Sequence, residues 1–255
     1  MRRRIELIRL RYTARFTRTT TCVLGPKLTI ADAAAFLCSF HEIFQQELYC
    51  FHSTNPSPLI IDGGANIGLG VLYFCRLYPR SRIIAFEPDP ALFAMLERNV
   101  RTFGLDGVDT RNEALWVSTG IQSFQSEGAE AGRLTRTGDQ TTHSVPCVRL
   151  RDYLRDPVDL LKLDIEGAET DVLLDCRDLL HNVRNIFVEY HSFDQERQRI
   201  QELLAALIGA GFRLQMQPVR SIAKPLVQRD LLLGMDMQVN IFGFRDSAGL
   251  NKRSA

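Results

Sequence analysis

Short apolar runs alternate along most of the chain with segments in which apolar residues recur every three or four positions. The runs lie at 59–62, 82–87, 160–164 and 186–190. Runs of this length are typical of buried strands, and the spacing between them is typical of helices. Strands that alternate with helices predict an α/β fold, with a mainly parallel sheet covered by helices on both faces.

The regions on either side of this pattern add further elements. Residues 29–49 have helical spacing, Asp32 is placed to start the helix, and Asn55–Pro58 breaks it before the first strand. Near the other end, segments 212–216 and 237–244 are expected to form an antiparallel pair of strands across one sheet edge.

The stretch between the second and third runs is less regular. Segments 114–117 and 121–124 flank a polar turn in the manner of a hairpin. The polar segment 126–142 is predicted to be a mobile loop. Loops of this length in a compact domain are commonly either functional or disordered, and the sequence leaves both readings open.

The first eighteen residues are strongly basic. They contain seven arginines and one acid, Glu6, interleaved with apolar residues. A short amphipathic helix in weak contact with an anionic membrane surface would fit this pattern, and so would a solvated or frayed arm. We expect the arm, because chain ends are usually loose. The predicted divisions are a basic arm at 1–28, a helical extension at 29–58, a main domain at 59–246 and a tail at 247–255.

The composition and net charge limit which classes of binding partner and which compartment we expect. The 255 residues carry a formal net charge of +1, so no overall field would draw the protein to nucleic acid, and we expect no nucleic-acid partner. No apolar run reaches the ~18 residues of a membrane span, and the basic start lacks the apolar core of a secretion signal. The six cysteines are scattered with no C-x-x-C pair, which favours free thiols and a cytoplasmic protein.

A glycine-rich turn, Asp62–Gly68, follows the first strand. Glycine lets a ligand approach the backbone closely, and the helix that follows offers free N–H groups. A phosphate-binding loop would need Lys and then Ser or Thr where the chain has Leu69 and Gly70. A dinucleotide fingerprint would need glycine at position 65, which is Ala65. The candidate cofactor-binding residues in the turn are Asp62, Gly63, Gly64, Asn66 and Gly68.

Further candidates lie where later strands end, because ligands of such sheets sit at the carboxyl ends of the strands. Glu87 closes the second strand, near the ~20-residue offset at which an acid receives ribose hydroxyls, and Pro88 biases it toward extended geometry. Glu113 and Ala114 are placed to meet the adenine amino group and a ring nitrogen. A surface acid is the alternative interpretation of Glu113.

Proton transfer is assigned to a third group of residues. Asp164 and Glu166 lie two positions apart, so extended geometry would put both carboxylates on one face of the strand tip. Apolar neighbours would raise their pKa values and suit one of them to act as a base. His191 brings an imidazole to the same edge. Glu169 is explained by its place in the first turn of a helix, where negative charge is favourable.

These three candidate catalytic residues, Asp164, Glu166 and His191, could also hold a divalent ion that lowers the pKa of a hydroxyl. Carboxylates suit Mg²⁺ better than zinc. We rank proton transfer above this interpretation and assign no metal.

Taken together, these motifs resemble the FkbM family of S-adenosylmethionine-dependent methyltransferases. The resemblance runs from about Phe44 to Phe244 and is carried by the order and spacing of five segments, 61–68, 85–88, 96–99, 161–169 and 187–190. It implies a Rossmann-like methyltransferase fold, a mainly parallel seven-stranded sheet with an antiparallel edge strand. Gly63 departs from the β-branched residue that many members carry.

The resemblance also implies roles for residues. It assigns Gly63, Gly64 and Asn66 to the methionine moiety of S-adenosylmethionine, Glu87 to the ribose, and Asp164 with Glu166 to the floor beside the methyl group. It implies methylation of a hydroxyl on a sugar, glycan or natural product. An NAD-dependent oxidoreductase and a non-catalytic nucleotide-binding module are the alternatives.

Overall fold

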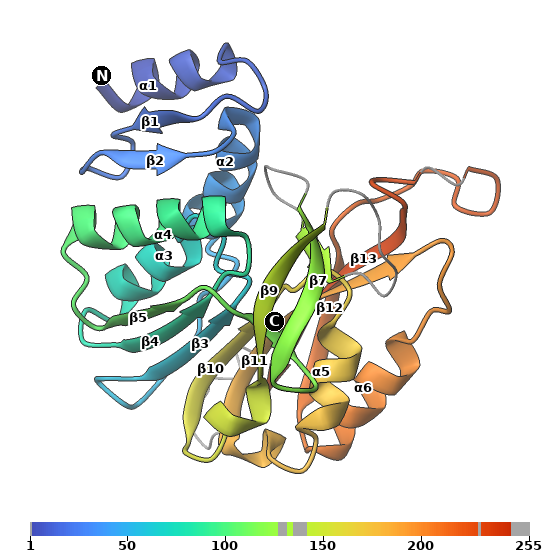
Figure 1. Cartoon of the computed structure of the whole chain (residues 1–255). Helices are drawn as coiled ribbons and strands as arrows, with labels where there is room; N and C mark the ends of the chain where they lie inside the picture. The colour runs from blue at the N-terminus through green and yellow to red at the C-terminus, as the bar shows by residue number, and fades with distance from the viewer. Residues whose placement is uncertain (1, 127–131, 135–141, 229–230, 246–255) are drawn as a thin grey trace, which may run out of the picture.

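A seven-stranded sheet forms the centre of the computed structural model, which describes residues 2–126, 132–134, 142–228 and 231–245 (Figure 1). Its strands are β3 (Leu59–Gly63), β4 (Arg82–Phe86), β5 (Val108–Arg111), β10 (Val158–Leu163), β11 (Val183–Phe193), β12 (Arg213–Pro218) and β13 (Met235–Phe244), in the spatial order β12-β13-β11-β10-β3-β4-β5. The predicted antiparallel pair is present. The strand that runs against its neighbours is β13, which lies between β11 and the edge strand β12.

Helices cover both faces of this sheet, as predicted. They are α3 (Leu69–Leu77), α4 (Pro90–Phe103), α5 (Glu169–Asp175) and α6 (Ile200–Gly209), with short 3₁₀ turns η2 (Leu150–Tyr153) and η3 (Leu180–Asn182). Ile60 packs with α3 and α4 in one core, whereas Ile61 packs with α5 and α6 in the other. Successive residues of a strand point to opposite faces, so the uninterrupted apolar run of β3 fills both cores.

The strand order reverses beside β3, and this fixes the place of the site. From β3 the chain moves outward through β4 to β5, then returns to pair β10 against the other side of β3. Loops that leave β3 and β10 in opposite directions open a crevice at the carboxyl ends of the two strands.

The N-terminal residues form an ordered unit. It consists of α1 (Arg2–Arg11), the hairpin β1 (Thr19–Thr21) and β2 (Leu28–Ile30), α2 (Ala33–Phe40) and the π-helical turn η1 (His41–Gln45). Leu10 is buried and Leu7 packs against the same core, so the expectation of a solvated or frayed arm is wrong. Asp32 caps α2 by accepting a hydrogen bond from the Ala35 N–H, although the helix begins at Ala33 and not at 29.

A buried asparagine attaches this unit to the main sheet. The Asn99 side chain on α4 exchanges two hydrogen bonds with the backbone of Thr29 and donates a third to the Ile67 carbonyl. The N-terminal unit is therefore held directly against α4, and the same asparagine reaches the glycine-rich turn through Ile67.

A second, four-stranded sheet corrects the predicted hairpin. It contains β6 (Ala114–Trp116), β7 (Gly120–Ser126), β8 (Gly132–Leu134) and β9 (Thr142–Arg149) in the order β6-β9-β7-β8. β6 pairs with β9, which lies between β6 and β7, so 114–117 and 121–124 are not hairpin partners. Most of the predicted mobile loop lies outside the described residues.

Two further findings concern membrane-spanning helices and cysteines. In the described part of the chain, no helix has the length and apolarity needed to cross a membrane. All six cysteines are free.

Candidate active site

The glycine-rich turn brings two strand ends into contact. Gly64 has φ +79°, and a Cβ built on it would lie 1.8 Å from the Asp164 carbonyl oxygen. Gly63 is also confined, because its Cβ would lie 2.8 Å from Leu115 Cδ1. Gly68 has φ +91° and starts α3. Glycine at position 64 is thus required by the close approach of two backbones before any ligand is considered.

Glu87 folds back onto this turn. Its two carboxylate oxygens accept hydrogen bonds from the Asn66 N–H at 2.8 Å and from the Asp89 N–H at 2.9 Å. Burial raises the pKa of Glu87 to about 7, although these two N–H groups oppose the shift. The Asn112 side chain donates to the carbonyls of Glu87 and Pro88 and so holds the strand end in place.

Glu113 and Ala114 lie in the same cavity wall as Glu87. The Glu113 Oε2 atom is buried and finds no hydrogen-bond donor among the described residues. A buried oxygen without a donor is costly, so a ligand donor at this place would be favourable. This geometry fits an amino group and disfavours the interpretation of Glu113 as a surface acid.

Lys162 is a site residue that the apolar pattern did not reveal. Its ammonium is buried between Asp62 Oδ1 at 3.2 Å and Asp164 Oδ2 at 3.5 Å, and it donates a 2.7 Å hydrogen bond to the Gly64 carbonyl. Burial alone would lower the pKa of Lys162, but the two carboxylates hold it above its ordinary value. The available signal was a lysine inside an otherwise apolar strand.

Asp164, Glu166 and His191 come together, but the extended geometry expected to align Asp164 with Glu166 is wrong, because β10 ends at Leu163. The His191 Nε2 atom lies 3.6 Å from Glu166 Oε2 and 3.9 Å from Asp164 Oδ1. Glu166 has φ +55°, which turns the chain sharply after Asp164. Glu189 adds a further carboxylate, with its Oε1 atom 3.6 Å from the same imidazole nitrogen.

Glu169 has a larger role than the helix dipole suggested. Its carboxylate is buried and accepts hydrogen bonds from the N–H groups of Ile165 and Gly167, and its Oε1 atom lies 3.0 Å from His191 Nδ1. Glu169 therefore fixes both the loop that carries Glu166 and the orientation of the imidazole. Because favourable charge at the start of α5 already explained Glu169, its contact with His191 was not expected from the sequence.

The pKa values of Glu166 and His191 are raised for different reasons. Burial raises the pKa of Glu166 to about 8, against the opposing effect of His191. Burial would lower the pKa of His191, but the neighbouring carboxylates, above all Glu169, raise it well above its ordinary value. The neighbouring carboxylates therefore favour the protonated imidazole of His191, and burial favours the protonated carboxyl group of Glu166.

Two cavities meet at this cluster. The smaller, of about 70 Å³, is lined by Glu87, Pro88, Glu113 and Ala114 among others. The larger, of about 300 Å³, extends from Asp62 and Lys162 to α2 and the 219–232 region. Residues lining both cavities are Gly64, Asn66, Asp164 and Glu166. His191 lies behind this junction and lines neither cavity.

Three side chains at the junction could also ligate a metal. One ligand atom from each of Asp164, Glu166 and His191 lies within 4.8 Å of the others. Two carboxylates and an imidazole can hold a divalent cation, and the Glu169 carboxylate on His191 Nδ1 would orient the ligating nitrogen.

Comparison with known proteins gives a consistent family. The chain is 31% identical to the methyltransferase sdnD of Sordaria araneosa over 65% of its own length and 78% of that protein. It is 29% identical to the 31-O-demethyl-FK506 methyltransferase FkbM of Streptomyces tacrolimicus, over 71% of this chain and 83% of that one. The crystal structure of a methyltransferase FkbM from Methylobacillus flagellatus KT superposes with a TM-score of 0.54 at 13% identity, over 79% of this chain and 46% of that one.

A domain profile decides the assignment. The profile described as the methyltransferase FkbM domain matches residues 62–214, more than half of the chain. The matched stretch begins at the buried Asp62, includes the glycine-rich turn, Glu87 and the Asp164 cluster, and ends in β12. An oxidoreductase on a similar sheet is therefore set aside, and the chain belongs to the FkbM family of S-adenosylmethionine-dependent methyltransferases.

Proposed function

We propose that this enzyme transfers the methyl group of S-adenosylmethionine to a hydroxyl oxygen of a small-molecule or glycan acceptor. The observation that carries the proposal is the meeting of two cavities at the carboxylates of Asp164 and Glu166. One cavity suits the adenosine half of the cofactor, and the other has room for the methionine half and an acceptor.

The smaller cavity fits adenosine in its donor and acceptor groups. Glu87 offers carboxylate lone pairs to the ribose hydroxyls, and the unpaired Glu113 oxygen is an acceptor for the adenine amino group. The methionine half would then lie along Gly63, Gly64 and Asn66 toward Asp62 and Lys162, in the larger cavity. S-adenosylmethionine bound in this way supplies a methyl group on a positively charged sulfur.

Glu166 is the proposed proton acceptor. It lines both cavities, and a pKa of about 8 suits a base that works near neutral pH. The acceptor oxygen bonds to the methyl carbon while the carbon–sulfur bond breaks and its electron pair stays on sulfur. The hydroxyl proton passes to Glu166, and S-adenosylhomocysteine and the methyl ether are left.

Asp164 and His191 are proposed to support this step. Asp164 lies at the junction with its charge partly offset by Lys162. His191 lies outside both cavities with its Nε2 atom 3.6 Å from Glu166 Oε2, so we assign it the positioning of Glu166 and not the removal of the substrate proton. The sequence grouped His191 with Asp164 and Glu166 as a candidate catalytic residue, and this proposal gives the three residues different roles.

Mg²⁺ is a second way to activate the hydroxyl. The Asp164, Glu166 and His191 ligand set would hold the ion beside the methyl group and lower the pKa of a bound hydroxyl. The two mechanisms differ in one measurement. Base catalysis by Glu166 predicts turnover that survives a chelator, whereas a metal mechanism predicts activity that a chelator removes and Mg²⁺ restores.

The test combines binding with turnover. Calorimetry should show that the protein binds S-adenosylmethionine and gives no heat with NAD. Incubation with a panel of hydroxylated small molecules and glycans should then release S-adenosylhomocysteine, and Glu166→Gln should bind the cofactor and lose that release. Tight cofactor binding without methyl transfer to any acceptor would instead favour the non-catalytic binding module.

A further inference from the structure

Helix α1 has two apolar faces, and only one is covered. Leu7 and Leu10 point inward, and the Arg3 guanidinium stacks on the Phe40 ring at 5.2 Å. Ile5 and Ile8 on the opposite side are 57% and 54% exposed. Their spacing continues to Tyr12 just beyond the helix, which is 87% exposed, so the three side chains form one outward strip.

Arginines flank this strip. At 100° per residue, Arg4 and Arg11 fall along one side of it and Arg9 falls on the other. Glu6 is the acid of the helix, and it is already paired with Arg9 at 2.8 Å. An exposed apolar strip flanked by arginines is complementary to a surface that has an anionic outer layer over an apolar interior.

A second apolar patch lies on residues 219–228 and 231–234, which we call the second segment. Leu226 and Val227 are 98% and 81% exposed, and a tight turn presents them because the Lys224 carbonyl accepts the N–H groups of Val227 and Gln228. Leu231 to Leu233 add three further half-exposed side chains. In Figure 1, α1 lies at the top left of the molecule and this segment at the upper right.

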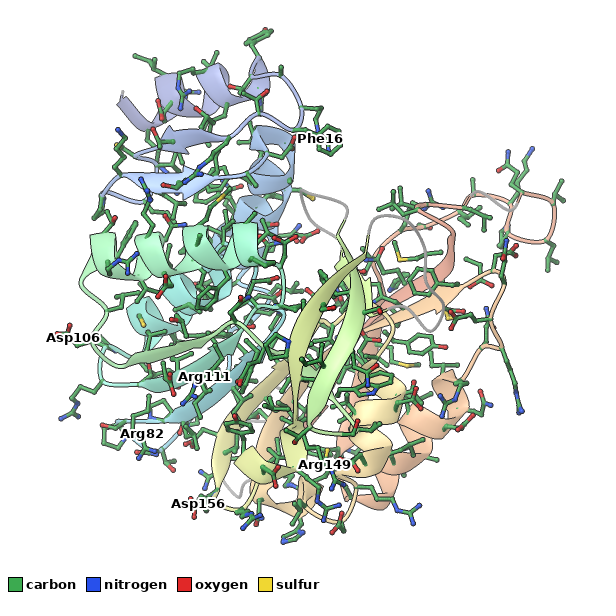
Figure 2. All side chains as sticks on the ribbon, viewed as in Figure 1. Phe16, Arg82, Asp106, Arg111, Arg149 and Asp156 are labelled. Atoms are coloured by element: carbon green, nitrogen blue, oxygen red, sulfur yellow. The ribbon has the colours of Figure 1, made fainter. Side chains whose placement is uncertain are left out.

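Residues of the N-terminal unit and of the second segment line the larger cavity together. Ala31, Asp32 and Ala35 line it from the N-terminal unit, and Val219 with Leu232 line it from the second segment. The Asp32 carboxylate is held by Arg15 and accepts the Phe16 N–H. Phe16 is 67% exposed and projects from the N-terminal unit on the side that faces the second segment in Figure 2.

The exposed apolar side chains of the α1 strip, Phe16, Leu226, Val227 and 231–233 belong to the N-terminal unit and the second segment, and we call this set the docking face.

We propose that the docking face binds an anionic membrane surface and turns the larger cavity toward it. The apolar strip of α1 and the tip at Leu226 and Val227 would enter the headgroup layer, and Arg4 and Arg11 would meet lipid phosphates. A symmetric dimer through α1 is disfavoured, because it would bring the arginines of two copies against one another. The docking proposal does not depend on the proposed methyl transfer. Docking would, however, supply that reaction with acceptors from the membrane surface.

The test uses the full chain and vesicles of two compositions. The protein should sediment with vesicles of three parts phosphatidylcholine to one part phosphatidylserine, less with added salt, and not with phosphatidylcholine alone. Ile5→Asp/Ile8→Asp and Leu226→Asp/Val227→Asp should each lower the vesicle affinity at least tenfold. Ile208→Asp is the control, because Ile208 is 61% exposed on α6, outside the docking face, and should bind like the parent protein.

Folding and S-adenosylmethionine binding of each variant are checked first, so a loss of sedimentation reports the face alone. Absence of sedimentation by the folded parent protein would overturn the proposal. So would equal losses in the Ile208 control, or a dimer in solution that the Ile5/Ile8 variant dissociates.

Discussion

The two cavities of the site differ in how their charges are satisfied. In the smaller cavity, Glu87 is held by backbone N–H groups and Glu113 keeps one free oxygen, so a neutral ligand with hydroxyl and amino groups completes the hydrogen bonds. Among the described residues, six carboxylates and the ammonium of Lys162 line the larger cavity. Those carboxylates are Asp32, Glu42, Asp62, Asp164, Glu166 and Glu189.

This difference indicates that the two cavities favour different chemical groups. Hydrogen bonds in the smaller cavity can select adenosine, whereas in the larger cavity the ammonium of Lys162 offsets part of the negative charge. Carboxylates outnumber cations in the described lining of both cavities, which favours a positively charged group such as a sulfonium or ammonium near their junction. The same excess disfavours phosphorylated or carboxylated acceptors. Substitutions at the junction, and then in each cavity in turn, can break or sharpen this contrast.

The largest effect is expected where the two cavities share backbone. Gly64→Val would place a Cβ 1.8 Å from the Asp164 carbonyl oxygen, so the turn and β10 cannot both keep their positions. We expect a loss of more than ~4 kcal/mol in the free energy of unfolding, enough to prevent folding of a marginal domain. Thermal denaturation measures it.

The matched control for this change is Gly104→Ala. Gly104 also has positive φ, at +63°, but a Cβ added there would meet nothing within 4 Å, so alanine should cost only ~1–2 kcal/mol. The sequence suggested that glycine in this turn serves the close approach of a ligand, which would make Gly64→Val damage cofactor binding more than stability. A soluble, cooperatively folded Gly64→Val protein would restore that interpretation.

Glu166→Gln should lower kcat by ~10²–10⁴ and leave cofactor affinity nearly unchanged, since a base acts in the transition state. The parent rate should rise as pH passes about 8, because the carboxylate must lose its proton to act as a base. The variant should lose that rise. A rate profile that stays the same in Glu166→Gln and disappears in His191→Asn would move the base to His191.

Lys162→Met tests the charge balance of the larger cavity. Removing the ammonium leaves Asp62 buried without its partner, and breaking a buried pair in this way costs about 3–5 kcal/mol. Chemical denaturation measures the loss. The double variant Lys162→Met/Asp62→Asn removes both charges and should recover part of it, whereas additive losses would show that the two residues are not coupled.

The position of each residue along its strand or helix explains whether the sequence could reveal its role. The glycine-rich turn, Glu87 and Asp164 lie at strand ends, and strand ends were visible in the apolar pattern. Lys162 lies inside a strand, and a lysine in an otherwise apolar run was a signal of a buried polar partner that did not say which residues it contacts. The pairing of β6 with β9 and the covered face of α1 depend on contacts distant in sequence, which local spacing does not encode.

The smallest effect is expected in the first cavity, at Glu87. Alanine there would leave the Asn66 and Asp89 N–H groups without acceptors, so Glu87→Gln is the cleaner change because its amide oxygen still accepts. Losing a charged acceptor for the ribose hydroxyls should weaken S-adenosylmethionine binding about tenfold. Burial places the pKa of Glu87 at about 7, so cofactor affinity of the parent protein should rise as pH increases through 7 and the carboxylate forms. Calorimetry at pH 6 and pH 8 checks both effects. If Glu87→Gln keeps the parent affinity at pH 8, the ribose is bound elsewhere; if it weakens binding but keeps the same pH dependence, the titrating group is another residue.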